Sequence, residues 1–218
     1  FHEMLELGEE LNDPDIQALA KIYLGDILRK RGRYQTAVQL LTTIQPLVNT
    51  ATPIVQGIRW QILARAHSSY GEETKFLQAI DHAHVIANET QETLDTHVHQ
   101  FNLVEVLQER AQGYTMLWQP EKALDIYQET DKLRPFRPMR DLGSYTIVKA
   151  QAHAYAGDVD GGINLALRGI ELARGYGSKR HVSRVQTMYD RLSITSFGTH
   201  PRLRDLKESL ATAPASNR

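Results

Sequence analysis

Two closely spaced pairs of histidines are the residues of this chain best suited, by type and spacing, to bind a metal ion. One pair is His82 and His84, and the other is His97 and His99. Zinc ligands on one helix must lie three or four residues apart, because residues two apart point to different faces. His82 and His84 fall inside a predicted helix and therefore diverge, whereas His97 and His99 lie near a predicted helix start without a cysteine or an obvious third ligand. We therefore expect structural roles for both pairs and no metal site.

A pair of glycines, Gly161 and Gly162, follows Asp158 and Asp160 and could indicate an ion-binding loop. An EF-hand, however, needs many more oxygen ligands over about twelve residues. Acids near the positive end of a helix dipole explain the same pattern, so we predict a helix start here. The chain also contains no Walker loop, nucleophile elbow, dinucleotide fingerprint or HExxH motif. These absences lead us to expect no enzyme activity and no cofactor.

A basic cluster near the C-terminal end could bind an acidic partner. It consists of Lys179, Arg180, Arg184, Arg191, Arg202 and Arg204. Helical spacing would allow Lys179, Arg180 and Arg184 to share one face with His181. A solvated helix face is our first interpretation of this cluster, and a docking patch for an acidic partner is the alternative.

Composition narrows the class of protein further. The formal net charge is −1, which argues against direct nucleic-acid binding by this region. Cysteine is absent, so the chain has no disulfide, no thiolate metal site and no cysteine nucleophile. No run of about 18 apolar residues and no signal peptide is visible, so we expect a cytoplasmic protein that does not bind a membrane. Because the sequence opens with Phe1 and not with Met, we expect a fragment of a longer protein.

The elements that position these side chains are predicted to be helices throughout. Apolar residues recur at i, i+3, i+4 and i+7, with no sustained alternation of the kind that strands show. Short breaks rich in Gly, Pro and Asn separate the helical segments. The predicted helices are 1–11, 14–31, 34–47, 53–69, 73–88, 97–117, 120–133, 138–156, 159–174, 178–194 and 201–211, followed by a frayed tail over 214–218.

The predicted helices fall into pairs, and the pairs repeat. A small residue precedes each tight turn by seven residues, at Gly25, Ala64, Ala111 and Ala150. A bulky residue follows the small one three positions later, at Leu28, His67, Tyr114 and His153. Five residues after each turn come Ala37, Phe76, Ala123 and Gly162. Small residues on both helices let the two backbones approach closely, and stacking buries apolar faces that a single pair would leave exposed.

Two histidines and one tryptophan take their expected roles from this repeat. His67 and His153 occupy the bulky position, so we expect both to pack with a satisfied ring nitrogen. Trp118 stands at a turn position where Gly is common, and we expect it to cover the loop or a neighbouring helix. Stacking on a ligand is the alternative for Trp118 and for Trp60.

With these features the sequence resembles the tetratricopeptide repeat (TPR) family. The best matching segments are Leu24-Gly25…Leu28…Gly32-Arg33-Tyr34…Ala37…Leu41 and Ala111…Tyr114…Pro120…Ala123…Tyr127…Pro135. The other two units depart from the pattern, since Phe76 and Gly162 stand where Ala is usual. The repeat spacings of 39, 47 and 39 residues exceed the standard period of about 34. The resemblance implies an all-α, right-handed superhelical solenoid of antiparallel helix pairs, with one TPR-like domain over 1–213.

The two ends of the chain resemble a narrower group of proteins. Residues 6–14 look like the second helix of a preceding repeat, of a kind common in bacterial signalling and transcription regulators. Residues 184–206 are similar to the close of TPR arrays attached to helix-turn-helix regulators. This resemblance implies a DNA-binding or ATPase module before Phe1.

In TPR proteins the first helices of successive pairs line a concave groove that binds a protein or peptide. Carried over by their offset from the small residue, the groove positions here are Ile22, Asp26, Arg29, Lys30, Gln61, Arg65, Ser68, Ser69, Gln108, Gln112, Thr115, Met116, Ile147, Gln151, Ala154 and Tyr155. Polar side chains in this set could hydrogen-bond an extended backbone, and Arg29, Lys30 and Arg65 could hold a carboxylate.

We therefore expect a protein- or peptide-binding scaffold that serves as the sensor or oligomerisation region of a bacterial transcriptional regulator. A ligand in the groove would change the superhelix curvature or the pairing of protomers, and so bias an attached effector domain. One alternative is a purely structural homodimerisation module, which exposed Leu and Val on the first or last helix would favour. The other is an enzyme on a helical scaffold, which a deep pocket with convergent carboxylates or histidines would favour.

Overall fold

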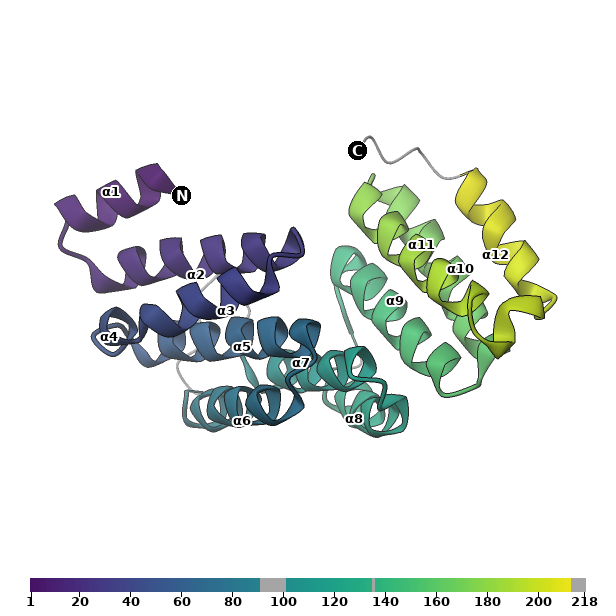
Figure 1. The fold of residues 1–218 in the computed structure, drawn as a ribbon, viewed down its shortest axis with the longest axis horizontal. Coiled ribbons are helices and arrows are strands. Elements are labelled where there is room, and N and C mark those ends of the chain that lie inside the picture. Colours follow the sequence, from purple (N-terminus) through teal and green to yellow (C-terminus); the bar gives the residue numbers. More distant parts are fainter. Residues whose placement is uncertain (91–100, 135, 213–218) are drawn as a thin grey trace. The chain divides into compact units, whose positions relative to one another are not determined.

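The computed structural model describes residues 1–90, 101–134 and 136–212. Within these ranges every regular element is a helix, and twelve of the elements are α-helices (Figure 1). The α-helices are α1 (His2–Glu10), α2 (Pro14–Lys30), α3 (Tyr34–Thr43), α4 (Gln45–Val48), α5 (Pro53–Tyr70), α6 (Glu73–Glu89), α7 (Leu103–Met116), α8 (Pro120–Leu133), α9 (Met139–Tyr155), α10 (Val159–Gly175), α11 (Lys179–Ser193) and α12 (Arg202–Ala211). A short 3-10 helix, η2 (Ser196–Thr199), precedes α12. The predicted all-α fold class is confirmed.

The sequence predicts no transmembrane helix, and the described helices can be compared with that prediction. None of the described helices combines the length and the apolar character that a membrane span requires.

One predicted helix is divided in the structure. The segment predicted as a single helix over 34–47 forms α3 and α4, which meet at Ile44. Pro46 accounts for the break, because proline lacks a backbone N–H and its ring clashes with the carbonyl four residues earlier. The helix predicted over 97–117 begins, in the described part of the chain, at Leu103. There Oδ1 of Asn102 accepts a hydrogen bond from the backbone N–H of Glu105 at 3.0 Å, while residues 97–100 lie outside the described residues.

Helix ends follow the local signals in the sequence. Oδ1 of Asp158 accepts a hydrogen bond from the backbone N–H of Gly161 at 3.0 Å, which confirms the predicted helix start in place of an ion loop. Gly71 and Gly157 end their helices with φ angles of +85° and +95°, in the left-handed region that glycine tolerates. Trp118 adopts the same conformation, with φ of +59°, although it carries a large side chain.

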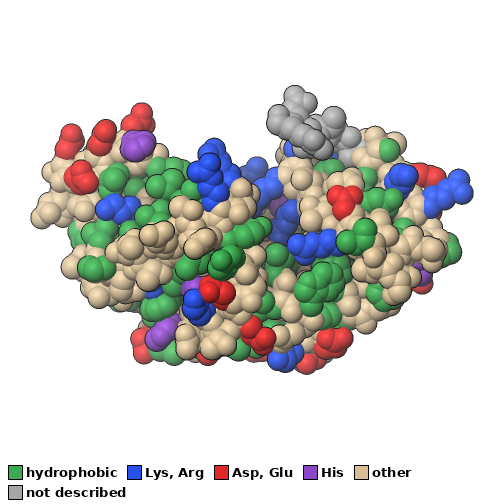
Figure 2. Space-filling view, in the orientation of Figure 1, with side chains coloured by type: hydrophobic (Ala, Val, Ile, Leu, Met, Phe, Trp, Pro, Cys, Tyr) green, Lys and Arg blue, Asp and Glu red, His purple; other side chains and the backbone are tan. Residues whose placement is uncertain are grey.

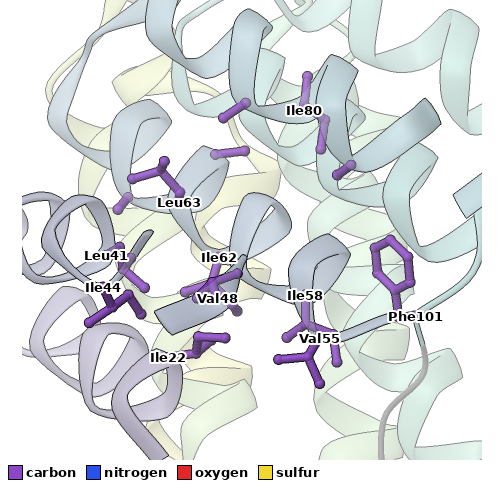
Figure 3. Close-up of a cluster of buried hydrophobic side chains, with 14 of the residues drawn as sticks. Ile22, Leu41, Ile44, Val48, Val55, Ile58, Ile62, Leu63, Ile80 and Phe101 are labelled. Atoms are coloured by element: carbon purple, nitrogen blue, oxygen red, sulfur yellow. The ribbon is translucent and has the colours of Figure 1, made fainter. Parts of the chain in front are cut away.

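The described chain divides into two compact units, Phe1–Leu117 (unit 1) and Trp118–Arg218 (unit 2). The expectation of one continuous domain over 1–213 stays a prediction. In unit 1, α5 packs against α2, α3, α6 and α7. Ile22 of α2, Leu41 of α3 and Ile62 of α5 gather in its core (Figure 3). Burial of each such aliphatic side chain stabilises the fold by about 1.5–3 kcal/mol, so this cluster holds α5 among its neighbours.

In unit 2 the most extensive helix contact is between α9 and α10. Gly162 permits it, because a Cβ at this position would lie 2.6 Å from the Cβ of Ala154 and 2.9 Å from the carbonyl oxygen of Ala150. The helix α11 packs against both α9 and α10, and α12 packs against α10 and α11. The core between them contains Ile147, Ile163, Ile170, Met188 and Leu192.

Phe76, the other departure from the small-residue pattern, is accommodated by a glycine on a neighbouring helix. A Cβ on Gly113 of α7 would lie 2.2 Å from atoms of the Phe76 ring. The ring also packs edge-to-face against Tyr114, with centroids 5.8 Å apart. The large side chain from α6 therefore occupies space that Gly113 leaves open on α7.

Candidate functional site

The first helices of three predicted pairs pack together in unit 1. The central helix α5 contacts both α2 and α7. This packing brings together the predicted groove residues of three helices, including Asp26 and Lys30 of α2, Arg65 of α5 and Gln112 of α7. The four groove residues Ile147, Gln151, Ala154 and Tyr155 lie on α9 in unit 2.

Three predicted groove residues, Ile22, Ile147 and Ala154, belong to the hydrophobic cores instead. All three are fully buried, so none offers a surface to a ligand, and this part of the prediction is corrected. Ile22 and Ile147 lie three residues before the small residue of their pair, and positions i and i+3 share a helix face. That face meets the second helix, since a Cβ on Gly169 of α10 would lie 2.5 Å from the Ile147 side chain. Also buried are Gln61, Ser68 and Thr115.

The remaining groove residues, apart from Asp26, keep part of their side chains accessible. Lys30 is exposed, and the half-buried members are Arg29, Arg65, Ser69, Gln108, Gln112, Met116, Gln151 and Tyr155. The amide nitrogen of Gln108 is buried and has no hydrogen-bond partner within the described ranges. A buried donor of this kind is expected to find a partner in protein, water or ligand.

The basic residues of the predicted groove are already engaged by carboxylates. Oδ1 of Asp26 accepts hydrogen bonds from Nε and Nη2 of Arg29 at 2.9 and 2.8 Å, and its other oxygen pairs with Lys30. Arg65 donates from Nε and Nη2 to the two carboxylate oxygens of Glu109 on α7. The planar fork of a guanidinium fits a carboxylate in this two-bond arrangement, which adds geometric specificity.

The charges in this cluster stabilise one another. Burial alone would raise the pKa of Asp26, but Arg29, Arg65 and Lys30 outweigh it and lower that pKa to about 2. Burial likewise acts to lower the pKa of Arg65, and the carboxylates of Glu109, Asp26 and Glu105 more than reverse this. The shifts in pKa of Asp26 and of Arg65 both favour the charged form, and the cations of α2 and α5 face acids of comparable number.

This balance changes what the surface can recognise. A ligand carboxylate would compete with Asp26 for Arg29 and with Glu109 for Arg65, which argues against a dedicated anion site. The surface does present donors and acceptors together, from the amides of Gln108 and Gln112 and from the Arg65–Glu109 pair. An extended peptide carries alternating N–H and C=O groups, so such a mixture suits backbone recognition better than recognition of a charge.

Two of the histidines, His67 and His153, have carboxylate partners. Nδ1 of His67 lies 2.7 Å from Oε2 of Glu72, and Nδ1 of His153 lies 2.9 Å from Oδ2 of Asp158, so the predicted satisfied ring nitrogen is confirmed for both. Burial lowers the pKa of His67, against the opposing effect of Glu72. No group of three His, Asp or Glu side chains suited to a metal ion occurs in the part of the chain that is described. The pair His97 and His99 lies outside the described residues.

The two tryptophans stack within their own units. Trp60 stacks on His82 with ring centroids 4.4 Å apart. Trp118 lies 4.9 Å from the ring of Tyr155, which confirms the prediction that it covers a neighbouring helix. Each tryptophan ring therefore contacts another ring of the protein.

A second polar cluster, in unit 2, was missed by the sequence analysis. Asp131 of α8 accepts a hydrogen bond from the hydroxyl of Tyr145 at 2.7 Å and pairs with Lys149. The guanidinium of Arg137 lies 3.7 Å from the centre of the Tyr145 ring. The spacing of Tyr145 and Lys149, four residues apart on α9, places them on one face. The acid comes from another helix, so the spacing alone does not reveal the cluster.

Comparison with known proteins provides no relative from which a function could be transferred. No family model matches the chain, and no curated protein matches it.

Proposed function

We propose that the chain is a TPR-like array of helix pairs whose first helices bind a protein or peptide. The packing inside each unit supports this architecture. In unit 1, α5 packs against both helices of the preceding predicted pair, α2 and α3, and α7 packs against both α5 and α6. In unit 2, α11 packs in the same way against both α9 and α10. A recurring arrangement of this kind is what stacked repeats require.

The observation that carries the binding role is the polar surface shared by α2, α5 and α7. Three neighbouring helices contribute partly accessible polar side chains to it, among them Lys30, Arg65 and Gln112. We call this surface the candidate groove. Gln108 of α7 is half-buried, and its buried amide nitrogen has no hydrogen-bond partner within the described residues.

A matched pair of double variants tests this role. The partner is first captured from a lysate of the source cells with the full chain, then purified, and its affinity is measured by calorimetry. Lys30→Ala/Gln112→Ala removes two accessible groove side chains. Lys75→Ala/Gln78→Ala removes the same two residue types from the exposed face of α6. Groove recognition predicts an affinity about tenfold or more weaker for the first variant and unchanged for the second. Equal affinities for both variants would contradict the proposal.

A role in transcription is proposed because both ends of the chain resemble segments of known regulators. Residues 6–14 and 184–206 resemble segments of bacterial regulators, and in such a protein the groove would act as the sensor. That the chain has no enzyme activity also stays a prediction.

A further inference from the structure

The first helix carries an acidic outer face. Glu3, Glu6 and Glu10 are exposed and have no ion-pair partner among the residues that the structure describes. Figure 2 shows acidic side chains gathered over α1, at the upper left of the view. Leu7 and Leu11 follow the same outward side and are 48% and 61% exposed. At helical spacing these five residues form one continuous face, while Gly8 on the opposite side meets α2.

Unit 2 carries a surface of the opposite charge. Arg140 at the start of α9 and Lys179 and Arg180 at the start of α11 are all exposed. In the described ranges none of the three has an ion-pair partner. The nearest acid in sequence, Asp141, pairs with Arg134 at 3.4 Å.

Arg140 and Arg180 both act on the same histidine, His181. Tyr176 and His181 lie at the contact between α9 and α11, where the Tyr176 hydroxyl is 3.1 Å from Nδ1 of His181. A Cβ on Gly143 of α9 would lie 2.1 Å from that hydroxyl oxygen. Burial, reinforced by Arg184, Arg180 and Arg140, lowers the pKa of His181 to about 4, as expected where positive charge is concentrated.

Exposed apolar side chains lie close in sequence to Arg140 of the basic surface, and Leu7 and Leu11 belong to the acidic face. Leu133, Phe136 and Met139 are 51%, 90% and 60% exposed, and Met139 directly precedes Arg140. The chain therefore has two surfaces with exposed apolar side chains, one acidic and one basic. Complementary charge, together with exposed apolar side chains on both partners, is a feature of protein interfaces.

We propose that the α1 face of one copy docks on the basic surface of unit 2 of a second copy, so that the chains associate head to tail. The acidic face comprises Glu3, Glu6, Leu7, Glu10 and Leu11, and the basic surface comprises Leu133, Phe136, Met139, Arg140, Lys179 and Arg180. The contact is heterologous, so each copy offers one surface of each kind, and successive contacts build either a closed ring or an open filament. Both surfaces lie outside the candidate groove, and the inference goes beyond the proposed function without depending on it.

Charge reversal with cross-rescue tests the pairing. Sedimentation velocity of the full chain is followed over a wide concentration range at ionic strengths from about 0.05 to about 0.5 M. The wild-type chain is expected to form concentration-dependent oligomers, and its association affinity should fall about tenfold or more as the salt concentration rises. Glu3→Lys/Glu6→Lys/Glu10→Lys and Arg140→Glu/Lys179→Glu/Arg180→Glu should each be monomeric alone. Mixed together they should associate again, because every contact in the mixture joins opposite charges.

Controls separate this outcome from misfolding or a different interface. Each altered residue is exposed, so circular dichroism and thermal unfolding of both variants should match wild type. Arg204→Glu/Lys207→Glu reverses two exposed cations of α12 and should leave association unchanged. A wild-type chain that stays monomeric, oligomers that survive both reversals, or a mixture that fails to associate would each overturn the proposal.

Discussion

Arg65 of α5 and Glu109 of α7 form an ion pair with two hydrogen bonds although 44 residues separate them in the sequence. The Arg65 side chain is 28% exposed and that of Glu109 is 12% exposed. The pair thus links two helices of unit 1 at the edge of the candidate groove. Its removal should affect stability more than a surface ion pair would.

We expect Glu109→Ala to lower the free energy of unfolding by about 2–3 kcal/mol, because it leaves a largely buried guanidinium without its partner. The double variant Arg65→Met/Glu109→Leu should recover part of that loss, since it removes both charges. Trp60 lies in unit 1 and Trp118 in unit 2, so urea unfolding of unit 1 can be followed by fluorescence in a Trp118→Phe background. A double variant no more stable than Glu109→Ala would contradict the claim that the unpaired guanidinium causes the loss.

Stability should fall as pH drops through the titration range of His181. Its unfolded pKa is about 6.5, and in the folded chain burial, with Arg184, Arg180 and Arg140, lowers it to about 4. Between these values the unfolded state binds more protons, so the stabilisation is complete above about pH 6.5 and is lost towards pH 4. We expect a loss of roughly 1–2 kcal/mol after allowance for solvent screening. The measurement is Trp118 fluorescence during urea unfolding of a Trp60→Phe variant, and His181→Gln should flatten the pH dependence. A His181→Gln curve that follows the parent curve would refute this assignment.

The close approach of α6 and α7 makes Gly113 sensitive to substitution. Gly113→Ala should destabilise unit 1 by about 1–3 kcal/mol through overpacking against Phe76, despite the better helix propensity of Ala. Phe76→Leu combined with Gly113→Ala should restore part of the loss. As a control, Gly175→Ala is expected to be neutral or stabilising, because the new Cβ would meet only Met139, at 4.0 Å. Thermal unfolding measures all three, and a Gly113→Ala variant as stable as wild type would contradict the packing argument.

Trp118 has a strained backbone conformation and a stabilising ring contact. Its left-handed φ costs an L-residue about 1–2 kcal/mol, and its contact with Tyr155 contributes about 0.5–1.5 kcal/mol. Trp118→Gly removes both effects and should lie close to wild type in stability. Trp118→Ala keeps the strain and loses the contact, so it should be about 1 kcal/mol less stable than Trp118→Gly in thermal unfolding. Equal stability of the Gly and Ala variants would show that the strain is negligible.

The helices could be predicted from the sequence because each depends on local signals. Apolar spacing and the glycine turns at Gly71 and Gly157 mark elements within a few residues of their ends. The division at Pro46 was missed because the apolar pattern continues through it, although proline chemistry argues for a break. The stacking order of the pairs depends on contacts between distant segments, which periodicity does not encode.

The candidate groove was predicted only in part. The offset from the small residue correctly identifies the helix that carries each groove position. Ile22 and Ile147, however, lie three residues before the small residue and therefore share its helix face, which packs in the core. Both were assigned to the groove and belong to the core. Glu109 was missed because nothing in its neighbourhood relates it to Arg65, which lies in another pair. A charge that is neutralised by a distant residue looks like a free charge in the sequence.

The contacts of His67 with Glu72 and of His153 with Asp158 bear on how the chain reaches its fold. Each histidine meets an acid only five residues further on, across the turn that joins the two helices of its pair. Closing so short a loop costs little conformational entropy. Each hairpin can therefore assemble as soon as its own residues leave the ribosome, before any later pair exists to stack on it, and low contact order of this kind favours fast folding.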